Sequence, residues 1–271
     1  MNGRMKILSK FYVGIIYAFL YLPIAVLIVF SFNDAKSRTV FTDFTFKWYE
    51  KLFTNDIILT AFRNTLIVAL VAGVCAVILG TLAAIGINAM SQKLQSLLLN
   101  ITYIPMMNPD IIIGVSLMLL FVFIRMELGF TSLILAHITF NVPIVIFNVL
   151  PKLRQLDKNV YNAALDLGCN PTQAFRKVVL PEIMPGILAG FLLSITYSFD
   201  DFAVSFFTGS ADSQTLSVVI YSMVRMKVSP EINALSTIMF VVVLFILLLV
   251  NINGARQDKK NAERNMAKEE G

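Results

Sequence analysis

The sequence predicts an all-α, polytopic membrane protein with six transmembrane helices and with both termini on the cytoplasmic side. Of its 271 residues, 57% are hydrophobic and only 14% are charged, whereas about 25% of a soluble domain is charged. The mean hydropathy is +0.76. Apolar runs long enough to cross a bilayer recur along the chain, and residues 156–181 form the long polar interval between them.

The apolar runs define the spans in chain order. The first run follows a basic segment and is too long for the core of a signal peptide, so we expect it to remain as an anchor. The predicted spans are residues 11–32, 57–89, 97–124, 131–150, 186–208 and 229–253. Residues 1–253 are therefore expected to form one transmembrane domain, and residues 254–271 a charged, disordered cytoplasmic tail.

The segments between the spans fix the expected orientation. Residues 33–56 interleave polar residues with aromatic ones, which suits a short helix at the outer interface, and residues 216–226 are expected to form a partly buried outer helix. With the N-terminus inside, inner segments hold 14 Lys and Arg and outer segments hold 8. The positive-inside rule therefore places residues 156–181 in the cytoplasm. It also accounts for the net charge of +5, so no nucleic-acid partner is implied.

The polar interval 156–181, which we call the elbow, begins with a predicted short helix. Asp157 is a favoured N-cap for a helix that runs to about Leu167, and Gly168 supplies a left-handed stop. The tandem Ala163-Ala164 leaves one face almost without side chains, so a partner's groove can approach the backbone closely. The alternative interpretation is an ordinary cytoplasmic loop.

A second short helix is expected in the rest of the elbow. Asn170 caps it, Pro171 occupies its first position, and Gln173 stands where a capping box requires it. Pro181 and Pro185 are expected to end this helix and to start the next element.

Three carboxylates fall within apolar runs: Asp110, Asp200 and Asp201. An acid in the middle of a bilayer costs about 2.5–3.5 kcal/mol, so these residues are expected to face a wet cavity or a positive partner. The spans offer no spare cation, which makes a cationic ligand the natural complement. Asp110 could instead cap the second half of a broken helix, and Asp201 could bond to a helix end or to a partner chain. Asp200 is the strongest candidate for lining a pathway.

Aromatic residues surround these acids in the sequence and favour cation–π contacts to an alkylammonium group. The candidates are Tyr197, Phe199, Phe202, Phe206 and Tyr103.

Other chemistries lack their motifs. No phosphate-binding Gly-Lys-Ser/Thr loop occurs, so the chain is not an ATPase, and no Ser-His-Asp or paired metal arrangement appears. His137 lies in an apolar run and is expected to pack or to form an interhelical hydrogen bond. Cys75 and Cys169 have neither metal-ligand nor disulfide spacing.

The elbow resembles the coupling-loop signature of ABC importer permeases, which reads Glu-Ala-Ala, three residues, Gly, nine residues, Ile-x-Leu-Pro. Here the matching residues are Asn162-Ala163-Ala164, Gly168 and Val178-Val179-Leu180-Pro181, with Asn162 in place of Glu. Residues 106–110 and 198–205 further resemble the spermidine/putrescine (PotC-like) branch of these permeases. The likeness extends from the first span to residue 253.

The resemblance implies a type I ABC importer permease (MetI-like) fold, in a bacterial cell membrane, that imports spermidine or putrescine by alternating access. It implies a chain that is not an enzyme and holds no cofactor, with ATP and Mg on a separate ATPase dimer (PotA-like). A second permease subunit (PotB-like) and an extracytoplasmic polyamine-binding protein (PotD-like) are the other implied partners. Asp110 and Asp200 are the implied pathway acids. The elbow residues implied to contact the ATPase are Asn162, Ala163, Ala164, Gly168, Leu180 and Pro181.

Three alternatives remain open at this point. The solute could be an iron complex, thiamine or a phosphonate, although an anion would call for Lys or Arg within the spans. A stand-alone secondary transporter would show internal repeats, and none is convincing. An intramembrane aspartyl enzyme would need Asp110 and Asp200 to share a proton.

Overall fold

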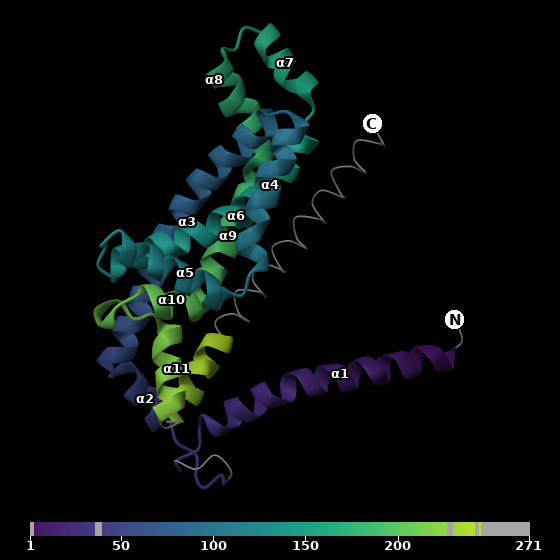
Figure 1. Cartoon of the computed structure of the whole chain (residues 1–271). Helices are drawn as coiled ribbons and strands as arrows, with labels where there is room; N and C mark the ends of the chain where they lie inside the picture. The colour runs from purple at the N-terminus through teal and green to yellow at the C-terminus, as the bar shows by residue number, and fades with distance from the viewer. Residues whose placement is uncertain (1–2, 36–39, 227–229, 242–243, 245–271) are drawn as a thin grey trace. The chain divides into compact units, whose positions relative to one another are not determined.

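The computed structural model describes residues 3–35, 40–226, 230–241 and 244, and its elements are helices (Figure 1). In chain order they are α1 (Gly3–Phe30), α2 (Lys47–Phe53), α3 (Asp56–Ala89), α4 (Gln92–Met107), α5 (Asp110–Phe123), α6 (Phe130–Gln155), α7 (Lys158–Asp166), α8 (Pro171–Ala174), the π-helical turn η1 (Phe175–Val179), α9 (Leu180–Asp200), α10 (Ala203–Thr208), the 3₁₀ turn η2 (Ala211–Ser213) and α11 (Leu216–Met226). Residues 230–241 are also helical. The chain divides into two compact units, residues 57–222 and the remainder, and each is described by itself.

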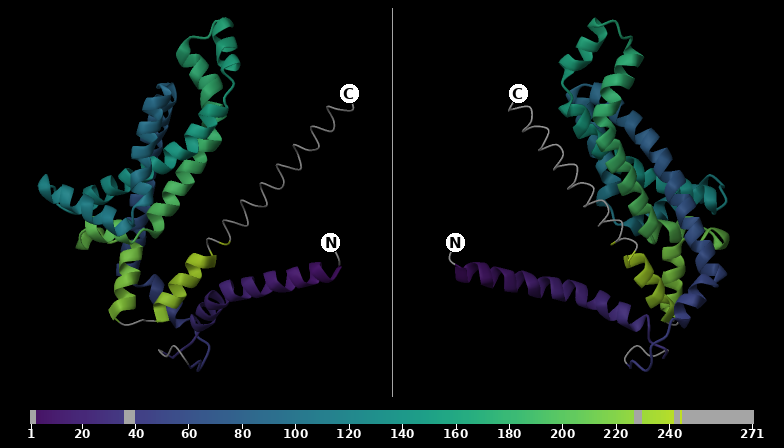
Figure 2. Two further views of the ribbon diagram at one scale, coloured as in Figure 1. Left: turned by 45° about the vertical axis from the view of Figure 1, so that its right-hand side comes forward. Right: turned by 180° about the vertical axis from the view of Figure 1, so that it is seen from behind.

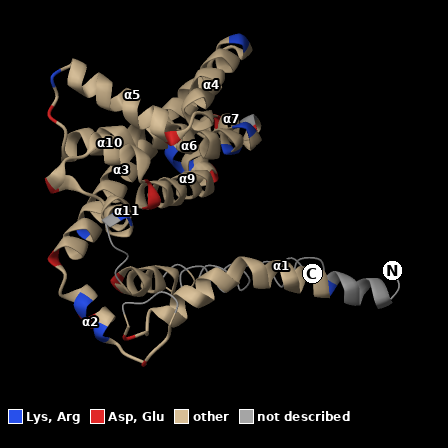
Figure 3. Ribbon diagram, turned by 60° about the horizontal axis from the view of Figure 1, so that its bottom comes forward, with Lys and Arg blue, Asp and Glu red and all other residues tan. Residues whose placement is uncertain are grey.

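The long helices match most of the predicted spans. Four described helical stretches are long and apolar enough to cross a membrane: Lys10–Phe30, Asp56–Ala89, Phe130–Gln155 and Pro171–Asp200. The bent pair α4 and α5 gives a fifth if it counts as one span. Lys, Arg, Asp and Glu are sparse along these helices and gather at their ends and in the connections (Figure 3). Most of the predicted sixth span beyond residue 241, and the whole predicted tail 254–271, lie outside the described residues.

The predicted span over residues 97–124 is broken near its middle, and the predicted alternative in which Asp110 begins the second half of a broken helix is the arrangement found. The two halves, α4 and α5, meet at an angle of 104°. Asn108 is extended, with a ψ of 145°, because the ring of Pro109 disfavours the helical conformation of the residue before it. The apolar run hides this break, since hydropathy carries no information about backbone direction.

The prediction that Pro181 and Pro185 end the second elbow helix is also wrong. α8 continues through η1 into α9 without leaving the helical region, so residues 171–200 form one helical stretch. In η1 the N–H of Leu180 reaches the carbonyl of Phe175, five residues back. This wider turn accommodates Pro181, which lacks an N–H and cannot make the usual bond to residue 177.

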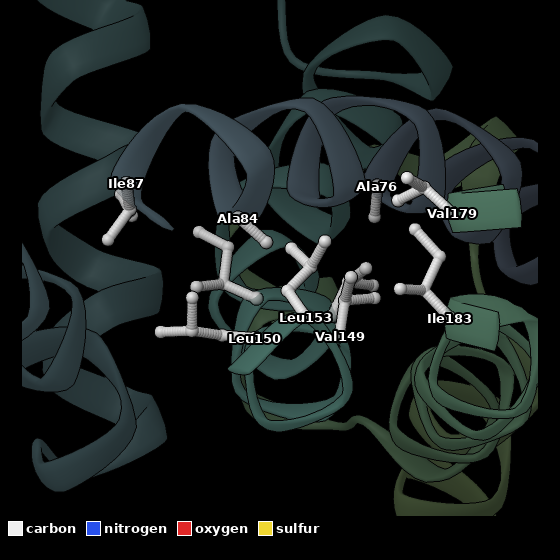
Figure 4. Close-up of a cluster of buried hydrophobic side chains, with 10 residues drawn as sticks. Ala76, Ala84, Ile87, Val149, Leu150, Leu153, Val179 and Ile183 are labelled. Atoms are coloured by element: carbon white, nitrogen blue, oxygen red, sulfur yellow. The ribbon is translucent and has the colours of Figure 1, made fainter. Parts of the chain in front are cut away.

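The core of the unit 57–222 lies where α3, α6 and α9 pack together (Figure 4). Its buried members are Ala76, Ala84, Ile87, Val145, Ile146, Val149, Leu150, Leu153, Val179 and Ile183. The small residues on α3 let α6 approach closely, as the Ala- and Gly-rich composition of this run predicts. The same packing fixes the distance between α6 and α9, the two helices that bound the elbow.

Gly186 marks the closest approach between α6 and α9. A Cβ atom at this position would lie 2.6 Å from the carbonyl oxygen of Asn148. We expect Gly186→Ala to lower the free energy of unfolding by about 1–3 kcal/mol, the usual cost of overpacking. Thermal unfolding of the purified protein in detergent measures this change. Gly86→Ala is the matched control, because nothing lies within 4 Å of a Cβ atom there; equal stability of the two variants would contradict the prediction.

The other unit contains α1, α2 and the helical residues 230–241. The buried Trp48 of α2 donates its indole N–H to the carbonyl of Asn33 at 2.7 Å, and the side chain of Asn33 accepts from the N–H of Thr42 at 2.9 Å. Lys51 forms an ion pair with the buried Glu231. The short helix predicted within residues 33–56 is thus confirmed as α2, and the helix predicted over residues 216–226 is confirmed as α11.

Candidate functional site

The first helix of the elbow has the predicted caps. The carboxylate of Asp157 accepts a hydrogen bond from the N–H of Asn159 at 2.9 Å and starts α7. At the other end Gly168 has a φ of +86°. Its N–H bonds to Leu165 O at 2.9 Å, and the N–H of Cys169 bonds to Ala164 O at 3.1 Å. This pair of bonds is a Schellman motif, in which glycine occupies the left-handed position.

The second helix of the elbow has the predicted capping box. The side chain of Asn170 accepts from the N–H of Gln173 at 2.8 Å, while Gln173 Oε1 accepts from the N–H of Asn170 at 3.1 Å. Pro171 occupies the first position of α8. The two capped helices stand beyond the ends of α6 and α9 as a projecting hairpin (Figure 2).

An apolar stripe on α7 and its C-cap residue is largely exposed to solvent. Val160, Ala163, Ala164 and Leu167 follow the spacing that places residues on one helix face. The side chains of Leu167 and Val160 are 87% and 50% exposed, and Ala163 is also exposed. Such a stripe on a surface helix is the feature by which amphipathic helices bind grooves. Of the other predicted contact residues, Asn162, Gly168 and Pro181 are exposed and Leu180 is partly buried.

A cavity of about 680 Å³ lies where the two helix breaks meet. One break separates α4 from α5 and the other separates α9 from α10, and α6 supplies the remaining wall. The side chains that line it are mostly apolar, apart from Asp110, Asp200, Asp201 and Tyr197. The structure therefore brings Asp110 together with the adjacent Asp200 and Asp201, although 90 residues separate Asp110 from Asp200 in the sequence. Among the described residues, no group of three His, Cys, Asp or Glu is placed to hold a metal ion.

The helix termini explain two of the three carboxylates. Asp110 is the first residue of α5 and Asp201 lies two residues before the start of α10, and a negative charge is stabilised at a helix N-terminus. Asp200 is the last residue of α9, where the helix dipole disfavours a negative charge. It is exposed toward the cavity. The end of α9 therefore does not stabilise the charge of Asp200 in the way that the N-termini of α5 and α10 stabilise the other two.

Asp201 organises the second break. Its two carboxylate oxygens accept from the N–H of Val204 at 3.2 Å and from the N–H of Ser205 at 2.7 Å, and its side chain is only 8% exposed. His137 of α6 lies beside Asp201 and Ser205, with its Nε2 atom 3.1 Å from Ser205 Oγ and 3.7 Å from Asp201 Oδ2. The prediction of an interhelical hydrogen bond for His137 is confirmed. The predicted alternative for Asp201, a bond to a helix end, is the arrangement found.

The aromatic candidates separate into two groups. Tyr197 and Phe202 line the cavity, and Phe206 packs on Phe202 with 5.5 Å between ring centroids. Phe199 does not reach the cavity; it packs against Phe62 of α3 at 6.2 Å. Tyr103 lines a different cavity, which lies along α4.

Sequence reasoning missed the polar residues that join α6 to α9 and α10. Asn141 Nδ2 donates to Ser198 Oγ at 2.7 Å, and Ser132 Oγ donates to the carbonyl of Thr208 at 2.8 Å, and all four residues are buried. The spacing of His137 and Asn141, four residues apart within an apolar run, was an available signal for a buried polar face.

We expect Asp201→Ala to destabilise the protein by about 1–2 kcal/mol, because the N-terminal N–H groups of α10 lose their cap. Asp201→Asn keeps an acceptor oxygen and should lose much less. Chemical unfolding in detergent compares the two variants. A loss for Asn as large as for Ala would show that the charge of Asp201, and not its capping oxygens, supports the break.

The fold and the cavity define a class: a helical, multi-pass membrane protein with carboxylates in a cavity at two helix breaks and with a polar elbow, carrying one apolar stripe, that projects beyond its spans. Residues 76–261 match the family described as "Binding-protein-dependent transport system inner membrane component". The chain belongs to this family of membrane transport permeases.

Individual relatives agree with this assignment. The chain is 37% identical over 261 residues to the spermidine/putrescine transport system permease protein PotC of Escherichia coli K12, which covers 96% of the chain and 98% of the relative. It is 36% identical over 237 residues to the putrescine transport system permease protein PotI of the same strain, with 82% of each chain covered.

Two solved structures share the fold. A chain of a bacterial ABC transporter for the acidic polysaccharide alginate superposes with a TM-score of 0.71 at 15% identity, covering 91% of this chain and 95% of the other. A chain of an amino acid ABC transporter superposes with a TM-score of 0.56 at 17% identity, covering 77% and 98%. At these identities the similarity concerns the fold alone.

Proposed function

We propose that the chain is the permease subunit of an ATP-binding cassette importer and forms part of the pathway for polyamines, spermidine or putrescine. The observation that carries this proposal is the cavity that gathers Asp110 and Asp200 at two helix breaks, with Tyr197 and Phe202 beside them. Carboxylates and aromatic rings together recognise alkylammonium groups. The names of the relatives support the same solute, because the chain covers 98% of PotC and 82% of PotI.

The elbow is proposed to dock in a groove of a separate ATPase dimer, which binds ATP and Mg. The exposed stripe of Val160, Ala163, Ala164 and Leu167 supports this assignment, because an apolar helix face outside the membrane is costly unless a partner covers it. Closure of the ATPase dimer would bring two elbows together and rock the attached helices α6 and α9. A second permease subunit and an extracytoplasmic polyamine-binding protein complete the proposed importer.

The proposed topology has six spans with both termini in the cytoplasm. Residues 1–253 would form the membrane domain, with the elbow inside the cell and residues 254–271 as a cytoplasmic tail. The distribution of Lys and Arg supports this orientation.

Uptake of labelled putrescine and spermidine tests the proposed function. The assay uses cells that lack their own polyamine importers and carry this chain together with its partner proteins. We expect ATP-dependent uptake. Other polyamines should inhibit this uptake, and neutral or anionic solutes should not. Uptake of a solute other than an amine would overturn the proposed substrate.

Co-purification tests the proposed assembly. An affinity-tagged chain is expected to elute with an ATPase and with a second permease. Elution as a self-sufficient monomer that transports without ATP would favour a secondary transporter instead.

A further inference from the structure

A second cavity, of about 530 Å³, lies along α4 at the end away from the acidic cavity. Its lining includes Gln92, Gln95, Asn100, Tyr103 and Arg154. The lining side chains are amides, hydroxyls, one leucine and one guanidinium, without a carboxylate. Arg154 Nη2 donates to Gln95 Oε1 at 3.3 Å, which holds the positive charge at the rim.

Both cavities are lined by residues of α4 and α6, and these two helices pack against each other. On each helix, residues three and four positions apart share a face. The stripe on α4 consists of Gln92, Ser96, Leu99, Tyr103 and Met106, whose last member lines the acidic cavity. The stripe on α6 consists of Phe140, Ile144, Phe147, Pro151 and Arg154, whose first two members line the acidic cavity and whose last lines the second. Both helices therefore present a continuous face from one cavity to the other.

An aromatic pair joins α4 and α6 between the two cavities. The ring centroids of Tyr103 and Phe147 lie 4.1 Å apart, with the planes inclined by 31°. The pair bridges α4 and α6 at the middle of both stripes. The neighbouring members of the two stripes, Leu99, Met106, Ile144 and Pro151, are smaller, so the two rings are the bulkiest side chains at this point of the α4–α6 contact.

We propose that the two cavities connect along this α4–α6 contact as one groove, that the groove is the chain's share of the inner half of the transport pathway, that the Tyr103–Phe147 pair is its constriction, and that Arg154 opposes re-entry from inside. The inference rests on the proposed function, since it takes the solute to be a cation. Two carboxylates attract such a solute at one end of the groove, and a guanidinium repels it at the other. A polyamine that passes the rings meets amides, which bind it weakly, and leaves past a charge that disfavours its return.

Thiol labelling of the assembled importer in a membrane tests the constriction. The two native cysteines, Cys75 and Cys169, are replaced by Ser, and single cysteines are introduced at Asn100, Met106 or Ile101. A water-soluble, membrane-impermeant maleimide is applied to the cytoplasmic side without nucleotide. Asn100→Cys is expected to react readily. Ile101→Cys is the control. Ile101 is exposed on the opposite face of α4, where we expect lipid to cover it in the membrane, so a water-soluble maleimide should not react there.

Met106→Cys reports on the far side of the rings. We expect slow labelling with Tyr103 present, and labelling about two- to tenfold faster in Tyr103→Ala, the range that corresponds to loss of one aromatic pair. Tyr103→Phe keeps the ring and should label at the original rate. Equal rates for Met106→Cys in all three backgrounds, or equal rates for Asn100→Cys and Ile101→Cys, would overturn the inference.

Arg154 is tested by preloading vesicles with putrescine. Internal putrescine should inhibit uptake more strongly in Arg154→Gln than in the unchanged chain, and Arg154→Lys should behave as the unchanged chain. Identical inhibition in all three would overturn the role of Arg154. The labelling experiment needs no substrate, so it tests the groove independently of the solute. If the importer takes up no putrescine, only the polyamine proposal is contradicted.

Discussion

Asp200→Asn is expected to lower polyamine uptake about 10- to 100-fold, the range that corresponds to loss of one charge-assisted hydrogen bond. The reason is the position of Asp200 at the C-terminal end of α9, where the helix dipole disfavours its charge and the proposed positive ligand would compensate it. The substitution keeps the size of the side chain and removes the charge. Initial uptake rates over a range of putrescine concentrations measure the effect, and most of it should appear as a higher half-saturation concentration.

Two controls separate this effect from misfolding. The amount of Asp200→Asn protein in the membrane, and its co-purification with the ATPase, should equal those of the unchanged chain. Asp212→Asn removes an exposed carboxylate that does not line the cavity, so its uptake should be normal. Unchanged uptake in Asp200→Asn would remove this residue from the pathway and leave Asp110 as the remaining candidate.

The elbow shows what sequence reasoning predicts well. Caps at Asp157 and Asn170 and the left-handed turn at Gly168 depend on a few neighbouring residues, so their signals can be read directly from the chain. The caps were therefore predicted residue by residue. The continuation of the helix through Pro181 could not be predicted in this way, because it depends on the packing of Val179 and Ile183 in the core, which keeps the helix continuous through a π-helical turn.

The helix breaks in the cavity show the opposite case. Hydropathy predicts that residues 97–124 and 186–208 each form a single span, although both contain a break that turns the backbone. Signals were present: Pro109 restricts the residue before it, and Asp201 precedes a run that it can cap. Neither signal decides by itself, because a break in a membrane span requires partners for the freed backbone groups. Those partners come from the carboxylate of Asp201 and from α6, and the sequence does not show that they meet.

Gly168→Val is expected to uncouple ATP hydrolysis from transport. The φ of +86° at this position is strained for any residue with a side chain, at a cost of about 1–2 kcal/mol, and a β-branched residue lies at the upper end. A penalty of this size shifts the local equilibrium about 5- to 30-fold toward other turn conformations. Those conformations lose the two bonds that close the Schellman motif, so the direction of α8 relative to α7 is no longer fixed.

The expected result is fewer polyamine molecules imported per ATP hydrolysed, while the ATPase and the mutant permease still co-purify. The ratio of labelled uptake to phosphate release in proteoliposomes measures it. Gly168→Asn is the matched control, since Asn tolerates the left-handed conformation far better than Val and should retain most of the coupling. No atom lies within 4 Å of a Cβ at this position, so steric overlap with the rest of the chain cannot produce the defect. Normal coupling in Gly168→Val would show that the force passes from the ATPase to α6 and α9 without a rigid turn in the elbow.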